Sequence, residues 1–370
     1  MMLIFVGAGF SKAVGSIPTM TGLERGFKDF LEGKNRYDLA RDYNTIKNQI
    51  EKAYKEFKLD KPDIEAILTV LENLKSEDPL CNIRNPTALY ILGMSPNLIE
   101  SARSSIKKEK ISEITQYLKE YLINQCLKGQ IKNSNLILYL FDINRVLKEW
   151  LLRESNEILK EVSENTPSLE IFTTNYDLIL ENFCRKNRIR YANGETTEDG
   201  RHIVDLSEEN KTLDPAQRCI KIFKLHGSAN WYTIKGEDDI FYHDLVEPIN
   251  RTRIGKKDKE VMIYPVTEKV WMKLPFSYSY LRFQKSLICS EEWVFVGFSF
   301  KDREIVDIII NAAEIRIKNS DPLKIWIIDP NTKEIKDRIN SLKDNVEPID
   351  KCWQDFIKDL QSTRLGVIFK

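Results

Sequence analysis

The chain has 370 residues, 42% hydrophobic and 30% charged, a composition typical of globular proteins and long enough for one large domain or two ordinary ones. Its 56 lysines and arginines balance its 56 aspartates and glutamates, so bulk charge indicates neither a nucleic-acid nor a membrane partner. No apolar stretch approaches the ~20 residues that span a bilayer. Six scattered cysteines without a C-x-x-C pair speak against a zinc site and favour a reducing cytosol. We therefore expect a cytoplasmic protein without bound metal.

The chain opens with an apolar run, residues 3–6, that stops at a Gly-Ala-Gly turn, residues 7–9. A continuous apolar run bounded by turn residues is typical of a strand buried on both faces of a parallel sheet. The glycines allow close approach of the backbone to a ligand, and Ser11 is placed to cap the helix that follows, which predicts an anion site. A plain strand-to-helix turn is the alternative, because Lys12 stands where G-x-G-x-x-G has its third glycine.

The next part of the chain, to about residue 165, has the pattern of helices. A first helix is expected at about 20–33. Within 63–72, apolar residues recur at i, i+3, i+4 and i+7, which predicts one buried helix face. The amphipathic pattern returns at 111–127 and 136–162, with breaks rich in Asn, Ser and Gly between them.

From residue 169 the pattern changes to short strands, and each predicted strand ends at polar or small residues. They are expected at 169–174, 219–225, 261–264, 293–296 and 324–328, with helices at 178–188 and 302–318. Ligands of a doubly wound parallel sheet bind beyond the carboxyl ends of its strands. We therefore expect all these strand ends to converge on one crevice.

These patterns predict an α/β fold, a Rossmann-like doubly wound parallel sheet with a mostly helical insertion. Residues 1–33 and 166–350 would form the sheet domain, residues 34–165 the helical insertion, and residues 351–370 a C-terminal segment.

Asn175 and His226 are the main candidates for catalysis, because each follows a predicted buried strand. His226 is the one histidine at a strand end, since His202 and His243 lie in polar, loop-like stretches. Histidine titrates near neutrality and suits a general base or a ribose contact. The alternatives are a histidine satisfied by backbone groups in a turn, and, for Asn175 and Asp177, ordinary helix capping.

Two later strand ends carry further candidates. Gly297 and Ser299 follow one strand, and Asp329 with Pro330 follows the next. An acidic group at a late strand end can accept hydrogen bonds from a ribose hydroxyl. Plain turns are the alternative at both places.

The motifs Gly-Ala-Gly-x-Ser, Gly-x-Ile-Pro, Thr-x-Asn-x-Asp, His-Gly and Gly-x-Ser follow one another along the chain. In this order they resemble the sirtuin superfamily, over about half of the chain. The resemblance implies a site for NAD with a base, a ribose contact and phosphate contacts. The implied catalytic residues are Asn175, Asp177 and His226, and the implied NAD contacts are Gly7, Ala8, Gly9, Ser11, Thr174, Gly297, Ser299 and Asp329 or Asn331.

The chain departs from protein-deacetylase sirtuins, since Thr19-Met20-Thr21 replaces their Phe-Arg pair and a four-cysteine zinc module is missing. Its motifs Thr-Thr-Asn-Tyr-Asp, Lys-Leu-His-Gly-Ser-x-x-Trp and Val-Gly-Phe-Ser resemble those of the bacterial sirtuin-like domains of antiphage defence systems. Asp63-Ile-Glu65 resembles that group too. Their activity is NAD hydrolysis, which depletes the cofactor in infected cells.

The resemblance thus implies an NAD+ glycohydrolase that releases nicotinamide and ADP-ribose as a defence effector, with NAD as substrate. It also implies a homo-oligomer and a hexameric DNA-translocating ATPase as partner, without a membrane or a direct nucleic-acid contact. The alternatives are a protein deacylase or ADP-ribosyltransferase, a subunit that binds NAD or ADP-ribose without turnover, and an assembly subunit.

Overall fold

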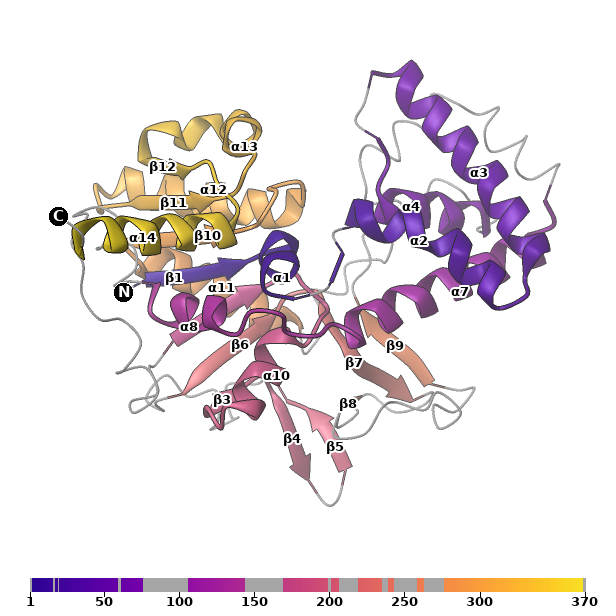
Figure 1. The fold of residues 1–370 in the computed structure, drawn as a ribbon, viewed down its shortest axis with the longest axis horizontal. Coiled ribbons are helices and arrows are strands. Elements are labelled where there is room, and N and C mark those ends of the chain that lie inside the picture. Colours follow the sequence, from indigo (N-terminus) through magenta and orange to yellow (C-terminus); the bar gives the residue numbers. More distant parts are fainter. Residues whose placement is uncertain are drawn as a thin grey trace. The chain divides into compact units, whose positions relative to one another are not determined.

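A computed structural model of the chain shows two compact units, each with its own core (Figure 1). The first comprises Met1–Ile17, Gly129–Met262 and Trp271–Lys370, and the second contains Pro18–Lys128. The structure describes residues 2–15, 17–18, 20–58, 61–75, 106–143, 169–198, 201–205, 219–234, 239–242, 258–262 and 276–368.

The first unit is built on a parallel sheet, as the sequence predicted, and this sheet has seven strands. Its order is β12-β11-β10-β1-β2-β6-β3. The strands in chain order are β1 (Met2–Val6), β2 (Leu169–Thr173), β3 (Tyr191–Ala192), β6 (Ile220–Lys224), β10 (Glu292–Val296), β11 (Lys324–Ile328) and β12 (Val346–Ile349).

The direction of winding reverses beside β1. From β1 the chain continues to β2, β3 and β6 on one side, and it then returns to β10, β11 and β12 on the other. The topological switch point therefore lies between β1 and β10, whose residues Phe5 and Phe295 are partners in register. Ligands of doubly wound sheets bind near such a point, beyond the carboxyl ends of the strands.

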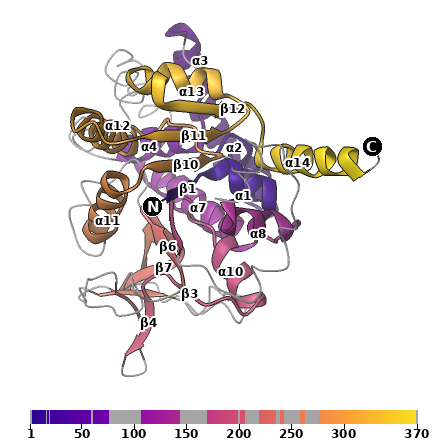
Figure 2. The ribbon, with the colours of Figure 1, turned by 90° about the vertical axis from the view of Figure 1, so that its left-hand side faces the viewer.

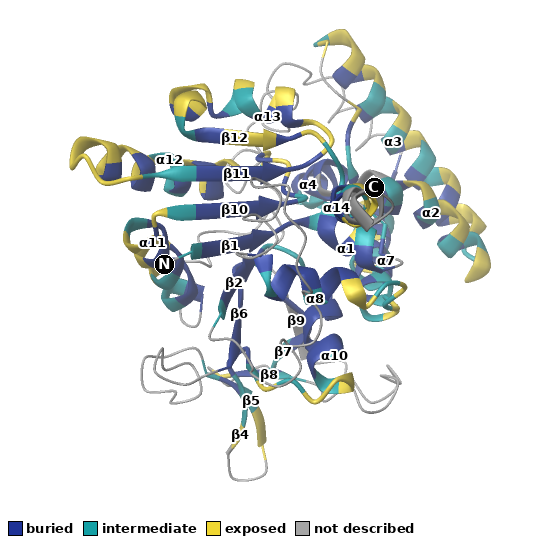
Figure 3. Cartoon of the chain, turned by 60° about the vertical axis from the view of Figure 1, so that its left-hand side comes forward, coloured by how far each residue is buried: buried dark blue, intermediate teal, exposed yellow. Residues whose placement is uncertain are grey.

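Helices cover both faces of this sheet because its strands are apolar on both sides (Figures 2 and 3). One face, with Ile4 and Val294, belongs to the core that the helices α1, α8, α10 and α14 share. On the other face, Phe5 packs against Phe283 of α11, with ring centroids 5.5 Å apart. The helices of this unit are α1 (Ala8–Val14), α8 (Asn135–Phe141), α10 (Ile179–Lys186), α11 (Phe276–Cys289), α12 (Arg303–Lys318), α13 (Thr332–Arg338), the 3-10 helix η4 (Asn340–Asn345) and α14 (Trp353–Ile368).

A second, antiparallel sheet of five strands was not predicted from the sequence. Its order is β4-β5-β8-β7-β9, from β4 (Glu195–Glu198), β5 (Arg201–Val204), β7 (Gly227–Ile234), β8 (Ile240–Tyr242) and β9 (Asp258–Met262). The strand expected at 261–264 therefore does not join the parallel sheet, because β9 pairs antiparallel with β7. The end expected at 264–265 lies outside the described residues. His202 lies within β5 and not in a loop, and His243 is not among the described residues.

The second unit contains α2 (Met20–Gly33), α3 (Tyr37–Glu56), α4 (Ile64–Lys75) and α7 (Lys108–Leu127). The predicted apolar face of α4 is buried, with Ile64, Ile67 and Leu71 each 0% exposed. The helices expected at 20–33 and 111–127 are confirmed. Of the helix expected at 136–162, α8 forms the start, and residues 144–162 lie outside the described part.

The compact units do not have the limits of the predicted domains. By contacts, α2 groups with the helical unit, although residues 20–33 were expected in the sheet domain, and α8 groups with the sheet, although it was expected in the insertion. α14 packs on α1 and α8. Among the described helices, none is long and apolar enough to cross a membrane.

Candidate functional site

Two glycine turns interlock at the switch point. The N–H groups of Gly7 and Gly9 donate to the carbonyls of Val296 and Gly297, each at 2.9 Å. A Cβ on Gly7 would lie 2.5 Å from the Gly297 oxygen, and one on Gly297, whose φ is +63°, would lie 2.3 Å from the backbone N of Phe10. The backbones therefore approach so closely that only glycine fits. These two amides serve the protein's own carbonyls in this arrangement.

The sequence predicted that Ser11 caps the helix that follows, but in the structure it does not. It lies inside α1, whose N-cap is Gly7, and it is 3% exposed. Its hydroxyl donates to Oδ2 of Asp177 at 2.7 Å. The serine is used for a tertiary contact because it faces the loop after β2, a neighbour that a local pattern cannot reveal.

Asn175 links that loop to the glycine turn. Its Nδ2 donates to the carbonyl of Gly7 and to Oγ of Ser11, both at 2.9 Å. Thr173 supports the loop, since its hydroxyl donates to the Val6 carbonyl at 2.8 Å and accepts from the Asn175 backbone N–H at 3.0 Å. These contacts fix the carboxamide plane. Among the described residues, none donates a hydrogen bond to Oδ1 of Asn175.

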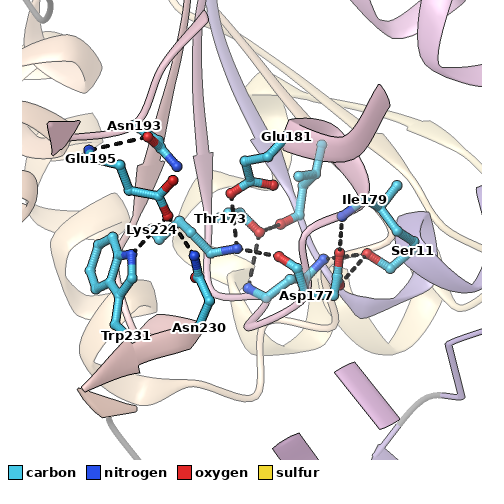
Figure 4. Close-up of polar contacts among 12 residues, drawn as sticks. Ser11, Thr173, Asp177, Ile179, Glu181, Asn193, Glu195, Lys224, Asn230 and Trp231 are labelled. Carbon is cyan, nitrogen blue, oxygen red and sulfur yellow. Dashed lines mark hydrogen bonds and ion pairs between the residues drawn. The ribbon is translucent and has the colours of Figure 1, made fainter. Parts of the chain in front are cut away.

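Hydrogen bonds of Asp177 and Lys224 stabilise the loop after β2 (Figure 4). Oδ1 of Asp177 accepts from the Ile179 N–H at 3.1 Å, at the start of α10. The ammonium of Lys224, 1% exposed, donates to the Asp177 carbonyl and pairs with Glu181 at 3.2 Å. Burial raises the pKa of the Glu181 carboxyl, and the Lys224 charge opposes that rise. Both carboxylate oxygens of Asp177 are thus engaged inside the protein.

A second polar cluster lies beside this one, where the two sheets meet (Figure 4). Glu195 of β4 accepts from Nδ2 of Asn230 at 2.8 Å and from the indole N–H of Trp231 at 3.2 Å. Trp231 is 2% exposed, so its aromatic ring belongs to the core. The cluster ties β7, which begins directly after His226, to β4.

His226 lies in the turn between β6 and β7, at the strand end next to that of Asn175. The two turns are joined by backbone bonds, from Leu225 N–H to the Thr173 carbonyl at 2.8 Å and from Ala229 N–H to the Tyr176 carbonyl at 2.9 Å. The imidazole Nε2 lies 3.0 Å from Oδ2 of Asp302.

Asp302 was not singled out in the sequence beyond marking the start of a helix. Burial alone would raise the pKa of this carboxyl, but the His226 charge and hydrogen bond, helped by the N–H groups of Ile305 and Glu304, lower it below its usual value. An acidic residue shortly after a glycine turn at a strand end is the only local signal that could have pointed to it.

The remaining candidates lie at the ends of β10 and β11. Ser299 is exposed and its carbonyl accepts from Arg338 of α13. Oδ1 of Asp329 accepts from the Asn331 N–H at 2.8 Å, a local turn that matches the plain alternative. Burial raises the pKa of the Asp329 carboxyl, against the bonds from Asn331. Thr174 is half-buried beside Asn175.

Some of the site residues predicted from the sequence are therefore in direct contact with one another. Gly7, Gly9 and Gly297 pack against one another, and Ser11, Asn175 and Asp177 share hydrogen bonds. His226 lies at the adjacent strand end, and Ser299 and Asp329 lie at the ends beyond the switch point. In the described part of the chain, no group of three or more His, Cys, Asp or Glu side chains could hold a metal ion.

Residues 169–349, just under half of the chain, match the family described as SIR2-like domain. The match runs from β2 to β12, so β1 and its glycine turn lie outside it. No curated protein sequence matches the chain.

Among solved structures, a mutant Sir2 homologue in complex with ADP-ribose aligns at 12% identity and a TM-score of 0.42, covering 100% of this chain and 94% of that one. A mutant of Sir2 homologues in complex with 2′-O-acetyl ADP-ribose aligns at 13% identity and 0.41, covering 99% and 92%. Asn175, His226 and Asp302 lie within residues 169–349, the segment that matches the SIR2-like domain family.

Proposed function

We propose that the chain is an NAD+ glycohydrolase that releases nicotinamide and ADP-ribose. One observation carries the proposal: a carboxamide and an imidazole, Asn175 and His226, lie at the ends of neighbouring strands beside the switch point, and Asn175 is fixed by the glycine turn. Ligands of doubly wound sheets bind at this place. The similarity of residues 169–349 to SIR2-like domains supports NAD as the substrate.

The chemistry needs little covalent help from the protein. Cleavage of the nicotinamide–ribose bond makes an oxocarbenium-like centre, and nicotinamide is a good leaving group. With its Nδ2 engaged, Asn175 presents Oδ1 as the acceptor for a ribose hydroxyl or for the attacking water. His226 takes the proton from that hydroxyl or water, a role worth about 10²–10⁴-fold in rate.

The glycine turn contributes its position rather than two free amides. Because the N–H groups of Gly7 and Gly9 are used by β10 and the turn after it, the pyrophosphate would be held by other groups of this loop, such as Ala8, and by the turn at Gly297 and Ser299. Asp329 and Asn331 at the end of β11 would face the adenine ribose. Asp177 supports Asn175 from inside the loop.

We assign the hydrolase to bacterial antiphage defence, as a cytoplasmic effector that depletes NAD in infected cells. The support is the spelling of its three motifs, Thr-Thr-Asn-Tyr-Asp, Lys-Leu-His-Gly-Ser and Val-Gly-Phe-Ser. A toxic hydrolase has to be restrained, so we propose control by homo-oligomerisation or by a partner such as a hexameric DNA-translocating ATPase. Mass measurement of the purified chain tests this, and a constitutively active monomer would contradict it.

The test of the activity is nicotinamide release from NAD+ by the purified chain, alone and with the candidate partner. Asn175→Ala and His226→Ala should each lower turnover at least about 10²-fold while the protein stays folded. Matched controls are Asn340→Ala and His202→Ala, since Asn340 is exposed and His202 lies in β5, and both should keep turnover.

Wild-type turnover by His226→Ala would contradict the assignment of the base. An absence of release in every condition, with NAD+ still bound, would instead favour a subunit that binds NAD or ADP-ribose without turnover.

A further inference from the structure

The contact between His226 and Asp302 joins two turns that are not neighbours in the sheet. β6, which precedes His226, and β10, which precedes Asp302, are separated by β1 and β2. Three strand spacings amount to about 14 Å. The segment 297–302 must therefore run across the carboxyl ends of β1 and β2 to bring the carboxylate within 3.0 Å of Nε2.

Aromatic packing fixes the path of the segment 297–302. Phe298 packs on Phe5 of β1, with ring centroids 4.6 Å apart, and Phe300 packs on Phe295 and Phe298 at 4.9 and 4.8 Å. Phe300 has a φ of 53°, in the left-handed region that costs an aromatic residue about 1–2 kcal/mol. Strain of this kind persists only where surrounding packing fixes it, and it is concentrated at functional sites.

The carboxylate itself is held on its other side. Oδ1 of Asp302 accepts from the Ile305 N–H at 3.3 Å, so the residue is the N-cap of α12. Its Oδ2 accepts from Nε2 of His226. A helix of sixteen residues thereby fixes the acceptor that faces the imidazole.

We propose that Asp302 is the positioning residue of His226, an inference that rests on the proposed function. A carboxylate facing Nε2 keeps the proton on that nitrogen, so Nδ1 is the basic nitrogen of the neutral ring and would take the proton from the ribose hydroxyl or water during the reaction. When Nδ1 takes that proton, the ring becomes an imidazolium and Asp302 stabilises its charge without taking up a proton itself. The proton leaves from Nδ1 after the products have formed.

Asp302→Asn tests the role, because asparagine caps a helix as well as aspartate but replaces the charged acceptor that faces His226 with a neutral amide. We expect kcat for nicotinamide release to fall about 10²-fold or more, with KM changed less than about threefold. Asp307→Asn is the matched control, the same substitution at an exposed position of α12, and it should keep kcat. A variant Asp302→Asn with wild-type kcat would overturn the positioning role.

A second readout does not depend on turnover. The chain has three histidines, so ¹⁵N-histidine labelling gives few signals, and His226→Gln identifies the one of interest. We expect the Nε2–H tautomer in the neutral wild-type ring and a changed tautomer balance in Asp302→Asn, but not in Asp307→Asn. An identical His226 spectrum in Asp302→Asn would overturn the proposal.

The two readouts separate the hypotheses. If the wild type releases no nicotinamide and the tautomer still depends on Asp302, the proposed function fails while the contact stands. If the wild type is active and Asp302→Asn changes neither kcat nor the tautomer, the positioning role fails and the proposed function stands.

Discussion

At the residue scale, the candidate site is a set of polar groups whose hydrogen-bonding capacity is mostly used inside the protein. Ser11 donates a hydrogen bond to Asp177 and accepts one from Asn175, which also donates to the Gly7 carbonyl. Such a chain orients each member through the next, and it leaves Oδ1 of Asn175 as a defined acceptor. Preorganised groups of this kind cost no rearrangement when charge develops during the reaction.

The stability that Asp302 contributes should depend on pH in a defined direction. Its pKa is lowered in the folded protein, so the contribution is fully present above the unfolded value of about 3.9 and is lost as the pH falls through the folded value. Urea unfolding of the wild type and of Asp302→Asn should therefore show a margin of about 1–2 kcal/mol at about pH 5.5 that shrinks at about pH 3.5. An equal margin at both pH values would show that the carboxylate charge does not stabilise the fold.

At the element scale, the turns after β1 and β10 behave as one structure. The two turns pack directly against each other, and two backbone hydrogen bonds of 2.9 Å join them. This explains why three glycines occur here, without reference to a ligand. It also ties the loop of Asn175 to the segment that ends at Asp302, because Gly7 contacts both.

Gly297→Ala should destabilise the protein by at least about 2 kcal/mol. The new Cβ would lie 2.3 Å from the backbone N of Phe10, and the φ of +63° is unfavourable for alanine. The backbone of one of the two turns would therefore have to move. The measurement is chemical unfolding. Gly33→Ala is the control, since no atom lies within 4 Å of its added Cβ and alanine favours a helix, so no loss of stability is expected there.

At the scale of the whole molecule, the chain forms two units with separate cores. The second unit packs Phe27 of α2 against Tyr43 of α3 and Tyr121 of α7, with ring centroids 4.8 and 5.7 Å apart. Ile67 and Leu118 are 0% exposed within the same unit. A core built from local helices needs few contacts from distant parts of the sequence.

A fragment of residues 18–128 should therefore fold alone into a helical protein. We expect a helical circular-dichroism spectrum and a cooperative thermal transition. Phe27→Ala should lower the free energy of unfolding of the fragment by about 3–5 kcal/mol. The exposed Tyr37 offers a control, because Tyr37→Ala removes an aromatic side chain without opening a core cavity. A fragment without a cooperative transition would show that the helices depend on the rest of the chain.

The sequence pattern predicted five strands of the parallel sheet, β1, β2, β6, β10 and β11, in their chain order. Apolar runs such as residues 3–6 and 293–296 are strands because only burial on both faces makes an uninterrupted apolar run favourable, and the 3.6-residue period of 64–71 places a helix face. The positions of Asn175 and His226 at strand ends followed from the same signal. The fold class could be predicted for this reason.

The contacts between side chains that are distant in the chain could not be predicted from the sequence. The second sheet was missed because strands β4, β5 and β8 are three or four residues long and pair with partners that no local pattern identifies. Ser11 finds Asp177 166 positions along the chain, and His226 finds Asp302 across two intervening strands. Hydrogen bonds and ion pairs act over about 3 Å, so they depend on how strands are ordered in the sheet, which residue type and spacing along the chain do not specify.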